Sequence, residues 1–315
     1  MRYTRFPVLA LLLATGLLAG CSKKNTVAGP VSGTPGAQPS NDQALVTSTV
    51  AAEDQLINDG LADGSFVTTL DPQAGQPGAL VAIQPLNYWR TIRSSDRTLE
   101  FAFSDPDTVG RPTTATITIR RRLLGQFNIL VGIPSTDGMP PDSTREVIHK
   151  PLEDHWVRRV LLKRVRLAGE SGEPLWRIVA VSGVDVTSRG VTTHIESLHV
   201  QTVDMDTVLT PLAFQRLRRI LRFEPQTMVT LTVKTDRVDD VVVLQHRDRR
   251  FRFHNNGDMT YTGVWPTGLF AAGLHHFGVN ALSHGTLFDD QAPYDSESWI
   301  FPYSLEPDML AEHMP

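Results

Sequence analysis

The segment Thr113-Thr114-Ala115-Thr116-Ile117-Thr118-Ile119-Arg120-Arg121 decides the fold class of this 315-residue chain. Its apolar residues Ala115, Ile117 and Ile119 alternate with threonines. Successive side chains of a β-strand point to opposite faces, so this alternation predicts a strand with one buried and one polar face. Threonine and isoleucine, which branch at Cβ, also favour strands.

The same alternation recurs on both sides of this segment. It predicts further strands over residues 99–103, 127–131, 175–186 and 191–203. Residues 156–167 leave two alternatives open, because their apolar side chains have helical spacing while their β-branched content favours a hairpin. The order of these segments predicts an antiparallel sheet.

Helical patterns flank the predicted strands. The spacing of Val46, Val50 and Ile57 predicts a helix over 44–61, and residues 86–92 are expected to form a second helix or a turn. Thr210 followed by Pro211 is typical of a helix start. We therefore expect residues 44–224 to form an α+β domain in which a helix packs on a curved antiparallel sheet.

The element order of that domain, with Trp176-Arg177-Ile178-Val179 beginning a strand, resembles the cone-shaped nuclear-transport-factor-like and cystatin-like folds. The resemblance implies a helix lying against the sheet. A lipocalin-like barrel is an alternative that the sequence leaves open.

Residues 225–315 contain short alternating strands separated by polar turns. Gly257-Asp258-Met259-Thr260-Tyr261-Thr262 and the following His275-His276 segment resemble immunoglobulin-like domains of the filamin and bacterial surface type. The resemblance implies a β-sandwich, with Tyr261 in a structural role as a tyrosine corner that bonds the backbone through its hydroxyl. Met259 departs from the glycine usual in that turn. The overall expectation is thus a mainly β chain with an α+β domain followed by an immunoglobulin-like sandwich.

The N-terminus carries a targeting pattern. Arg2 and Arg5 precede an apolar run over 6–18, which is shorter than the roughly 20 residues that span a bilayer. Leu18-Ala19-Gly20-Cys21 then resembles the lipobox of bacterial lipoproteins. The resemblance implies that residues 1–20 are a signal peptide and that Cys21 is acylated. In such lipoproteins an aspartate directly after the cysteine favours retention in the inner membrane. This chain has Ser22 at that position, which implies the outer membrane if the organism has one and the plasma membrane otherwise.

Composition adds three expectations. Residues 21–43 are rich in Gly, Pro and Ser and predict a flexible tether. Cys21 is the only cysteine, so disulfides and thiolate metal sites are excluded. Removal of Arg2 and Arg5 with the signal peptide leaves 28 basic and 34 acidic residues, which argues against nucleic-acid binding.

Histidines and carboxylates are the candidate metal ligands. On a strand His275 and His276 point to opposite faces, so a metal site would need His276 or His284 to meet a carboxylate from the following loop. His194 and Glu196 share a face, with His199 on the other, which is too few ligands for zinc. Carboxylates that could bind calcium at strand ends form three groups: Asp204 and Asp206; Asp239 and Asp240; Asp289, Asp290 and Asp295. None has the spacing of an EF-hand loop, and we expect no metal.

The sequence contains no catalytic motif and no cofactor-binding motif. We therefore expect a non-enzymatic, lipid-anchored protein of the bacterial cell envelope with a binding, adhesion or structural role. Its partners would be the membrane, through the lipid on Cys21, and an envelope protein or glycan. The alternative is a small-ligand-binding or hydrolytic protein whose Trp89, Trp156 and Trp176 line a pocket in the α+β domain.

Four basic runs occur: Arg120-Arg121-Arg122, Arg158-Arg159 with Lys163 and Arg164, residues 216–222, and residues 247–252. They predict either solvated faces or a binding face for acidic glycans, peptidoglycan or lipid headgroups.

Overall fold

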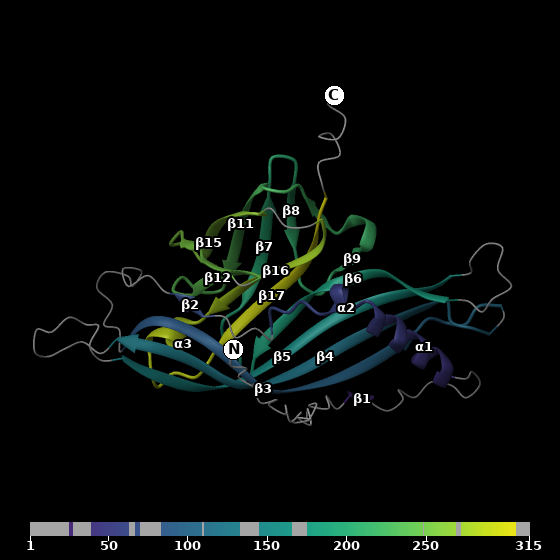
Figure 1. Ribbon diagram of the computed structural model, residues 1–315, viewed down its shortest axis with the longest axis horizontal. Coiled ribbons are helices and arrows are strands. Elements are labelled where there is room, and N and C mark those ends of the chain that lie inside the picture. Colours follow the sequence, from purple (N-terminus) through teal and green to yellow (C-terminus); the bar gives the residue numbers. More distant parts are fainter. Residues whose placement is uncertain are drawn as a thin grey trace, which may run out of the picture.

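The computed structural model describes residues 25–27, 39–62, 67–69, 83–108, 110–132, 145–165, 175–247, 249–268 and 272–306 (Figure 1). Of these described residues, 64% are in strands and 11% in helices, so the fold is mostly β. Cys21 and the predicted signal peptide, residues 1–20, lie outside the described residues.

Four long antiparallel strands dominate the molecule: β3 (Gln84–Phe103), β4 (Thr114–Gly132), β5 (Arg145–Val165) and β6 (Leu175–Ser188). Each pairs with the next along the chain. The opening segment forms the first part of β4, and its Ala115, Ile117 and Ile119 are buried, as the alternation predicts. The two predicted strands at 113–121 and 127–131 are one continuous strand.

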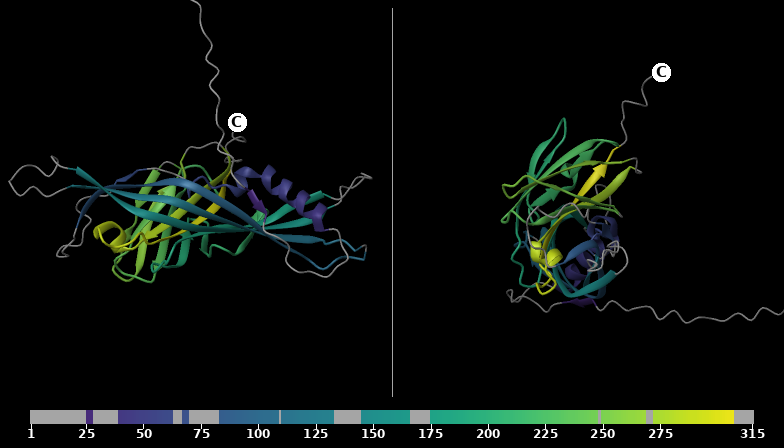
Figure 2. Two further views of the ribbon diagram at one scale, coloured as in Figure 1. Left: turned by 90° about the horizontal axis from the view of Figure 1, so that it is seen from below. Right: turned by 90° about the vertical axis from the view of Figure 1, so that its left-hand side faces the viewer.

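The same sheet continues from β6 through β17 (Ser296–Leu305), β16 (Gly273–Leu282), β12 (Val241–His246) and β13 (Arg249–Arg252). Four short strands extend it: β1 (Asn25–Val27) and β2 (Thr68–Thr69) on β3, β9 (Phe214–Arg216) on β6, and β10 (Leu221–Phe223) on β17. The resulting 12-stranded sheet is strongly curved and nearly closed (Figure 2).

A second sheet of five strands lies against the β12–β16–β17 part of the first (Figure 1). Its order is β14 (His254–Asn255), β15 (Thr260–Pro266), β11 (Met228–Thr235), β7 (Ile195–Gln201) and β8 (Asp206–Leu209). The two layers enclose a core that includes Leu231, Trp265, Phe277 and Tyr303.

The expected fold class, an α+β domain followed by an immunoglobulin-like sandwich, is wrong. β17 from the C-terminal region pairs with β6, with Ile300 opposite Val184 and Glu297 opposite Thr187. In the other direction, β7 from the central region pairs with β11. Backbone N–H and C=O groups must be paired wherever they are buried, and here strands distant in sequence satisfy them. One sheet therefore runs through both expected domains.

Only three short α-helices occur among the described residues: α1 (Pro39–Ala52), α2 (Asp54–Ile57) and α3 (His284–Phe288). We call residues 39–62 the strap, because α1 and α2 lie along the long sheet (Figure 1). Val46, Val50 and Ile57 of the strap pack against the sheet face that carries Ile117 and Ile119. The predicted helix at 44–61 thus exists, but it begins at Pro39 and is interrupted at Glu53.

Two local expectations need correction. Residues 86–92 are part of β3 rather than a helix or turn. Residues 156–165, for which the sequence left helix and hairpin open, are in strand β5, which pairs antiparallel with β6 as the hairpin alternative requires. After Pro211 the chain forms β9 and a single 3-10 turn, Leu217–Arg219, rather than an α-helix. In each case a neighbouring strand supplies backbone partners, and this tertiary pairing outweighs local helix propensity.

Candidate binding groove

A groove lies where the long strands bend. The β3–β4 register shifts between Ile92 and Ser94, directly opposite Gly125. Gly125 approaches β3 so closely that an added Cβ would lie 2.9 Å from the Thr91 carbonyl carbon, and nearer still to its oxygen. Only glycine fits such an approach, and the bulge bends both strands.

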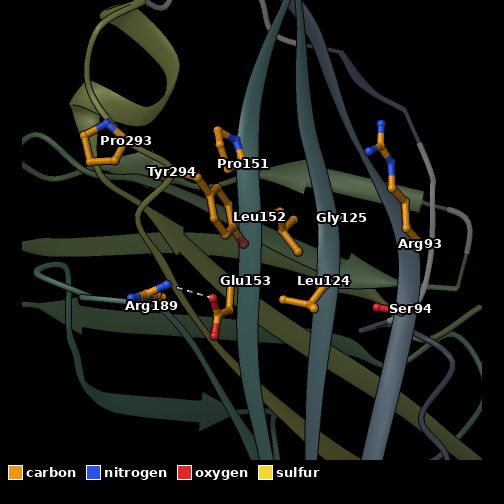
Figure 3. Close-up of a pocket in the computed structure, with 10 residues that line it drawn as sticks. All are labelled: Arg93, Ser94, Leu124, Gly125, Pro151, Leu152, Glu153, Arg189, Pro293 and Tyr294. Carbon is orange, nitrogen blue, oxygen red and sulfur yellow. Dashed lines mark hydrogen bonds and ion pairs between the residues drawn. The ribbon is translucent and has the colours of Figure 1, made fainter.

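The groove has a volume of about 520 Å³ and is lined by residues of β3, β4, β5, the turn after β6 and the loop after α3 (Figure 3). These residues are Arg93, Ser94, Leu124, Gly125, Pro151, Leu152, Glu153, Arg189, Pro293 and Tyr294. Its apolar part is formed by leucine, proline and tyrosine side chains, while the charged groups lie at its sides.

Glu153 is the acidic group of the groove, and both of its oxygens are engaged. Oε1 accepts a hydrogen bond of 2.7 Å from Arg122 Nε, and Oε2 accepts one of 3.3 Å from Arg189, drawn as a dashed line in Figure 3. The bond from Arg122 lowers the pKa of Glu153 below its usual value. A carboxyl group held ionised in this way is a weak proton donor near neutral pH.

Arg93 stands on the other side of the groove from Arg189 (Figure 3). It is exposed, and within the described residues its guanidinium has neither an ion pair nor a hydrogen bond. The groove thus combines an apolar floor with an arginine that pairs with no carboxylate of the described residues. Chemically it can hold an apolar side chain together with an acidic group, which a guanidinium binds through two parallel hydrogen bonds.

Buried polar contacts beneath the groove hold its lining residues in place. Arg90 of β3 forms an ion pair with Asp154 of β5, whose side chain is only 1% exposed. Tyr294, which lines the groove, lies next to this pair, and burial together with the Asp154 carboxylate raises the pKa of Tyr294. The tyrosine hydroxyl therefore stays protonated, and the loop after α3 is held against the long strands.

The two adjacent histidines do point to opposite faces. The ring of His275 lies 5.5 Å from that of Tyr303, on the side of the five-stranded sheet. His276 is buried on the strap side, where desolvation and the Arg158 guanidinium lower its pKa to about 3. His276 is therefore neutral at physiological pH.

The other ligand candidates are dispersed. His194 contacts Glu297 at 3.3 Å rather than Glu196, which pairs with Lys234 at 2.7 Å. His199 pairs with Asp206 at 2.5 Å. Asp295 accepts hydrogen bonds from the backbone N–H and hydroxyl of Thr192. Within the described ranges, no three histidine, aspartate, glutamate or cysteine side chains gather as metal ligands.

The tryptophans expected as pocket walls do not line the groove. Trp156 and Trp176 are buried in the core beneath the strap. Their indole N–H groups donate to Asp59 at 3.0 Å and to Asp42 at 3.2 Å, both strap residues. They hold the strap on the sheet. The hydroxyl of Tyr261 donates a 2.9 Å hydrogen bond to the Arg237 carbonyl oxygen, a contact that joins β15 to the turn after β11.

Sequence reasoning does not single out Gly125, Glu153 or Arg93. The pattern predicts a boundary between two strands at Gly125, and the glycine itself is the one signal of a close backbone approach. Glu153 and Arg93 are 60 residues apart in sequence, and nothing local connects them.

The chain matches no protein-family model, and neither curated proteins nor solved structures show significant similarity to it. No helix in the described ranges combines the length and apolar character needed to cross a membrane.

Proposed function

We propose that this chain is a lipid-anchored protein of the bacterial cell envelope, held through acylated Cys21, with a binding role and no catalytic activity. The proposal rests on the lipobox Leu18-Ala19-Gly20-Cys21 for its location. Ser22 favours the outer membrane over the plasma membrane.

The groove supports the binding role, and its charge favours an acidic partner. Arg93 has no carboxylate in the described residues, whereas the only acid of the groove, Glu153, already contacts Arg122 and Arg189. Beside Arg93, Leu124 and Pro151 offer an apolar surface. The occupant we propose is an extended segment of an envelope protein that carries a carboxylate next to an apolar side chain.

Anchoring is tested by replacing Cys21→Ser. The acylated protein should float with membranes in a density gradient, and the variant should lose its acyl chains without losing its far-ultraviolet circular dichroism spectrum. Acylated material recovered from the Cys21→Ser strain would contradict the anchoring.

Binding is tested by reversing the charge at Arg93 of β3 with Arg93→Glu. Arg111→Glu, in the loop between β3 and β4, is a control with the same charge change away from the groove. A photo-crosslinker placed at Ser94 should capture an envelope protein through an acidic peptide, identified by mass spectrometry. The Arg93→Glu change should abolish this crosslink and the control should preserve it. Equal crosslinking in both variants, or capture through a peptide without acidic residues, would exclude an acidic occupant.

A further inference from the structure

Two of the four basic runs of the sequence, over 158–164 and 216–222, meet on one outer face of the sheet. Residues of β5 alternate between faces, so that Val160 and Leu162 are buried while Lys163 points outward and is exposed. In the antiparallel register Lys163 lies directly opposite Arg177 of β6, which is also exposed. Two positive charges are thus neighbours across the strands.

β9 brings the second run to the same place. It pairs with the middle of β6 (Figure 1), with Arg216 opposite Ala180. The Arg159 guanidinium of β5 lies 4.7 Å from the centre of the Phe214 ring of β9. The 3-10 turn after β9 then adds Arg218 and Arg219, both exposed. We call these six residues the basic face: Arg159, Lys163, Arg177, Arg216, Arg218 and Arg219.

None of the six forms an ion pair within the described part of the chain. Their neighbours in sequence behave differently, since Arg164 turns to the strap and pairs with Asp42, and Arg222 pairs with Glu306. Like charges directly across strands destabilise a sheet. The fold therefore carries a local electrostatic cost in a chain whose net charge is −4, and an anionic partner would offset this cost.

We infer that the basic face docks the anchored protein on the phosphate headgroups of the membrane that holds it. This inference rests on the proposed lipid anchor. Five of the six cations are arginines, whose planar guanidinium groups bind phosphate through two hydrogen bonds.

The test uses the acylated protein in vesicles of phosphatidylcholine with or without phosphatidylglycerol. Because Cys21 is acylated, a single new thiol from Ala213→Cys, an exposed position beside β9, can be labelled with a fluorescent donor. Energy transfer to an acceptor on the lipid headgroups then reports whether the basic face lies on the bilayer. Transfer should be high with phosphatidylglycerol and fall in its absence, or at about 0.5 M salt, where the Debye length is about 4 Å.

The decisive variant combines Arg216→Gln, Arg218→Gln and Arg219→Gln. Each basic residue near an anionic surface raises the ratio of docked to undocked protein by a factor of about 5. Removing three of them should therefore lower this ratio about 100-fold. The matched control combines Arg111→Gln, Arg237→Gln and Arg249→Gln, which removes the same charge elsewhere and should leave transfer unchanged.

Two failures can be told apart. If the protein does not float with the vesicles, the anchoring proposal is wrong. If it floats but transfer is equal in both vesicle types, or equal in the two triple variants, the docking inference is wrong. Binding of a soluble acidic glycan that depends on the basic face, without transfer to the bilayer, would also overturn it and assign the face to a glycan.

Discussion

Gly125 gives the sharpest test of how the groove forms, through the substitution Gly125→Ala. The new methyl group would lie 2.9 Å from the Thr91 carbonyl carbon and 3.0 Å from the Ile92 Cα. Both atoms belong to the backbone of β3, so no flexible side chain can move aside. β3 and β4 must separate at the bulge.

The cost follows from what this separation breaks. Overpacking a tight site costs about 1–3 kcal/mol, and the loss of two ladder hydrogen bonds adds about 1 kcal/mol each. We expect the free energy of unfolding to fall by about 3–5 kcal/mol. For a chain of this length each kcal/mol lowers Tm by about 2 °C, so Tm should fall by about 6–10 °C.

The control is Gly190→Ala, in the turn after β6. Gly190 has φ +70°, and no atom lies within 4 Å of an added Cβ. Gly190→Ala should therefore lower the free energy of unfolding only by the cost of an alanine in the left-handed conformation, about 1–2 kcal/mol. Urea unfolding followed by tryptophan fluorescence compares the two variants. If Gly125→Ala loses no more stability than Gly190→Ala, the close approach of Gly125 to Thr91 does not set the bend.

Further predictions concern buried charges. Burial raises the pKa of Asp240 to about 7, so the folded state keeps a proton that the unfolded chain releases near pH 4, and stability falls as pH rises from about 4 to 7. Asp240→Asn should remove this pH dependence. The variant should be more stable than the parent at pH 8, by at most about 4 kcal/mol, and equally stable at pH 4. Equal pH profiles of the two proteins in thermal unfolding would contradict this. Arg158 is fully buried and donates to the Leu56 and Ile57 carbonyl oxygens at 2.7 and 2.6 Å. Arg158→Met should therefore cost about 3–5 kcal/mol and raise hydrogen exchange in α2, whereas Arg159→Met should leave α2 protected. Replacing Asp42→Ala removes the partner of Arg164 and Trp176 and should increase exchange in α1 alone; unchanged exchange there would show that this contact does not hold the strap.

Local pattern predicted much of the secondary structure, because strand alternation depends on neighbours in sequence. Ala115, Ile117 and Ile119 are buried as their spacing implies, and Val46 and Val50 mark a helix that exists. Opposite directions for His275 and His276 followed from the same geometry. Where local signals conflict, as over 156–165, the sequence left helix and strand open, and pairing of β5 with β4 and β6 decided for strand.

The sequence by itself determined which residues alternate and that the chain has a single cysteine, since both can be read from the residues without the fold; the resemblance of Leu18-Ala19-Gly20-Cys21 to a lipobox stays a prediction. Only the tertiary structure decided that β17 joins β6 and that β7 joins β11, because hydrogen bonding between strands does not depend on their separation along the chain. For that reason each of the two sheets contains strands from both expected domains. The same non-local pairing placed Arg93 across a groove from Arg189, and set Arg216 beside Arg177 and Lys163 on one face.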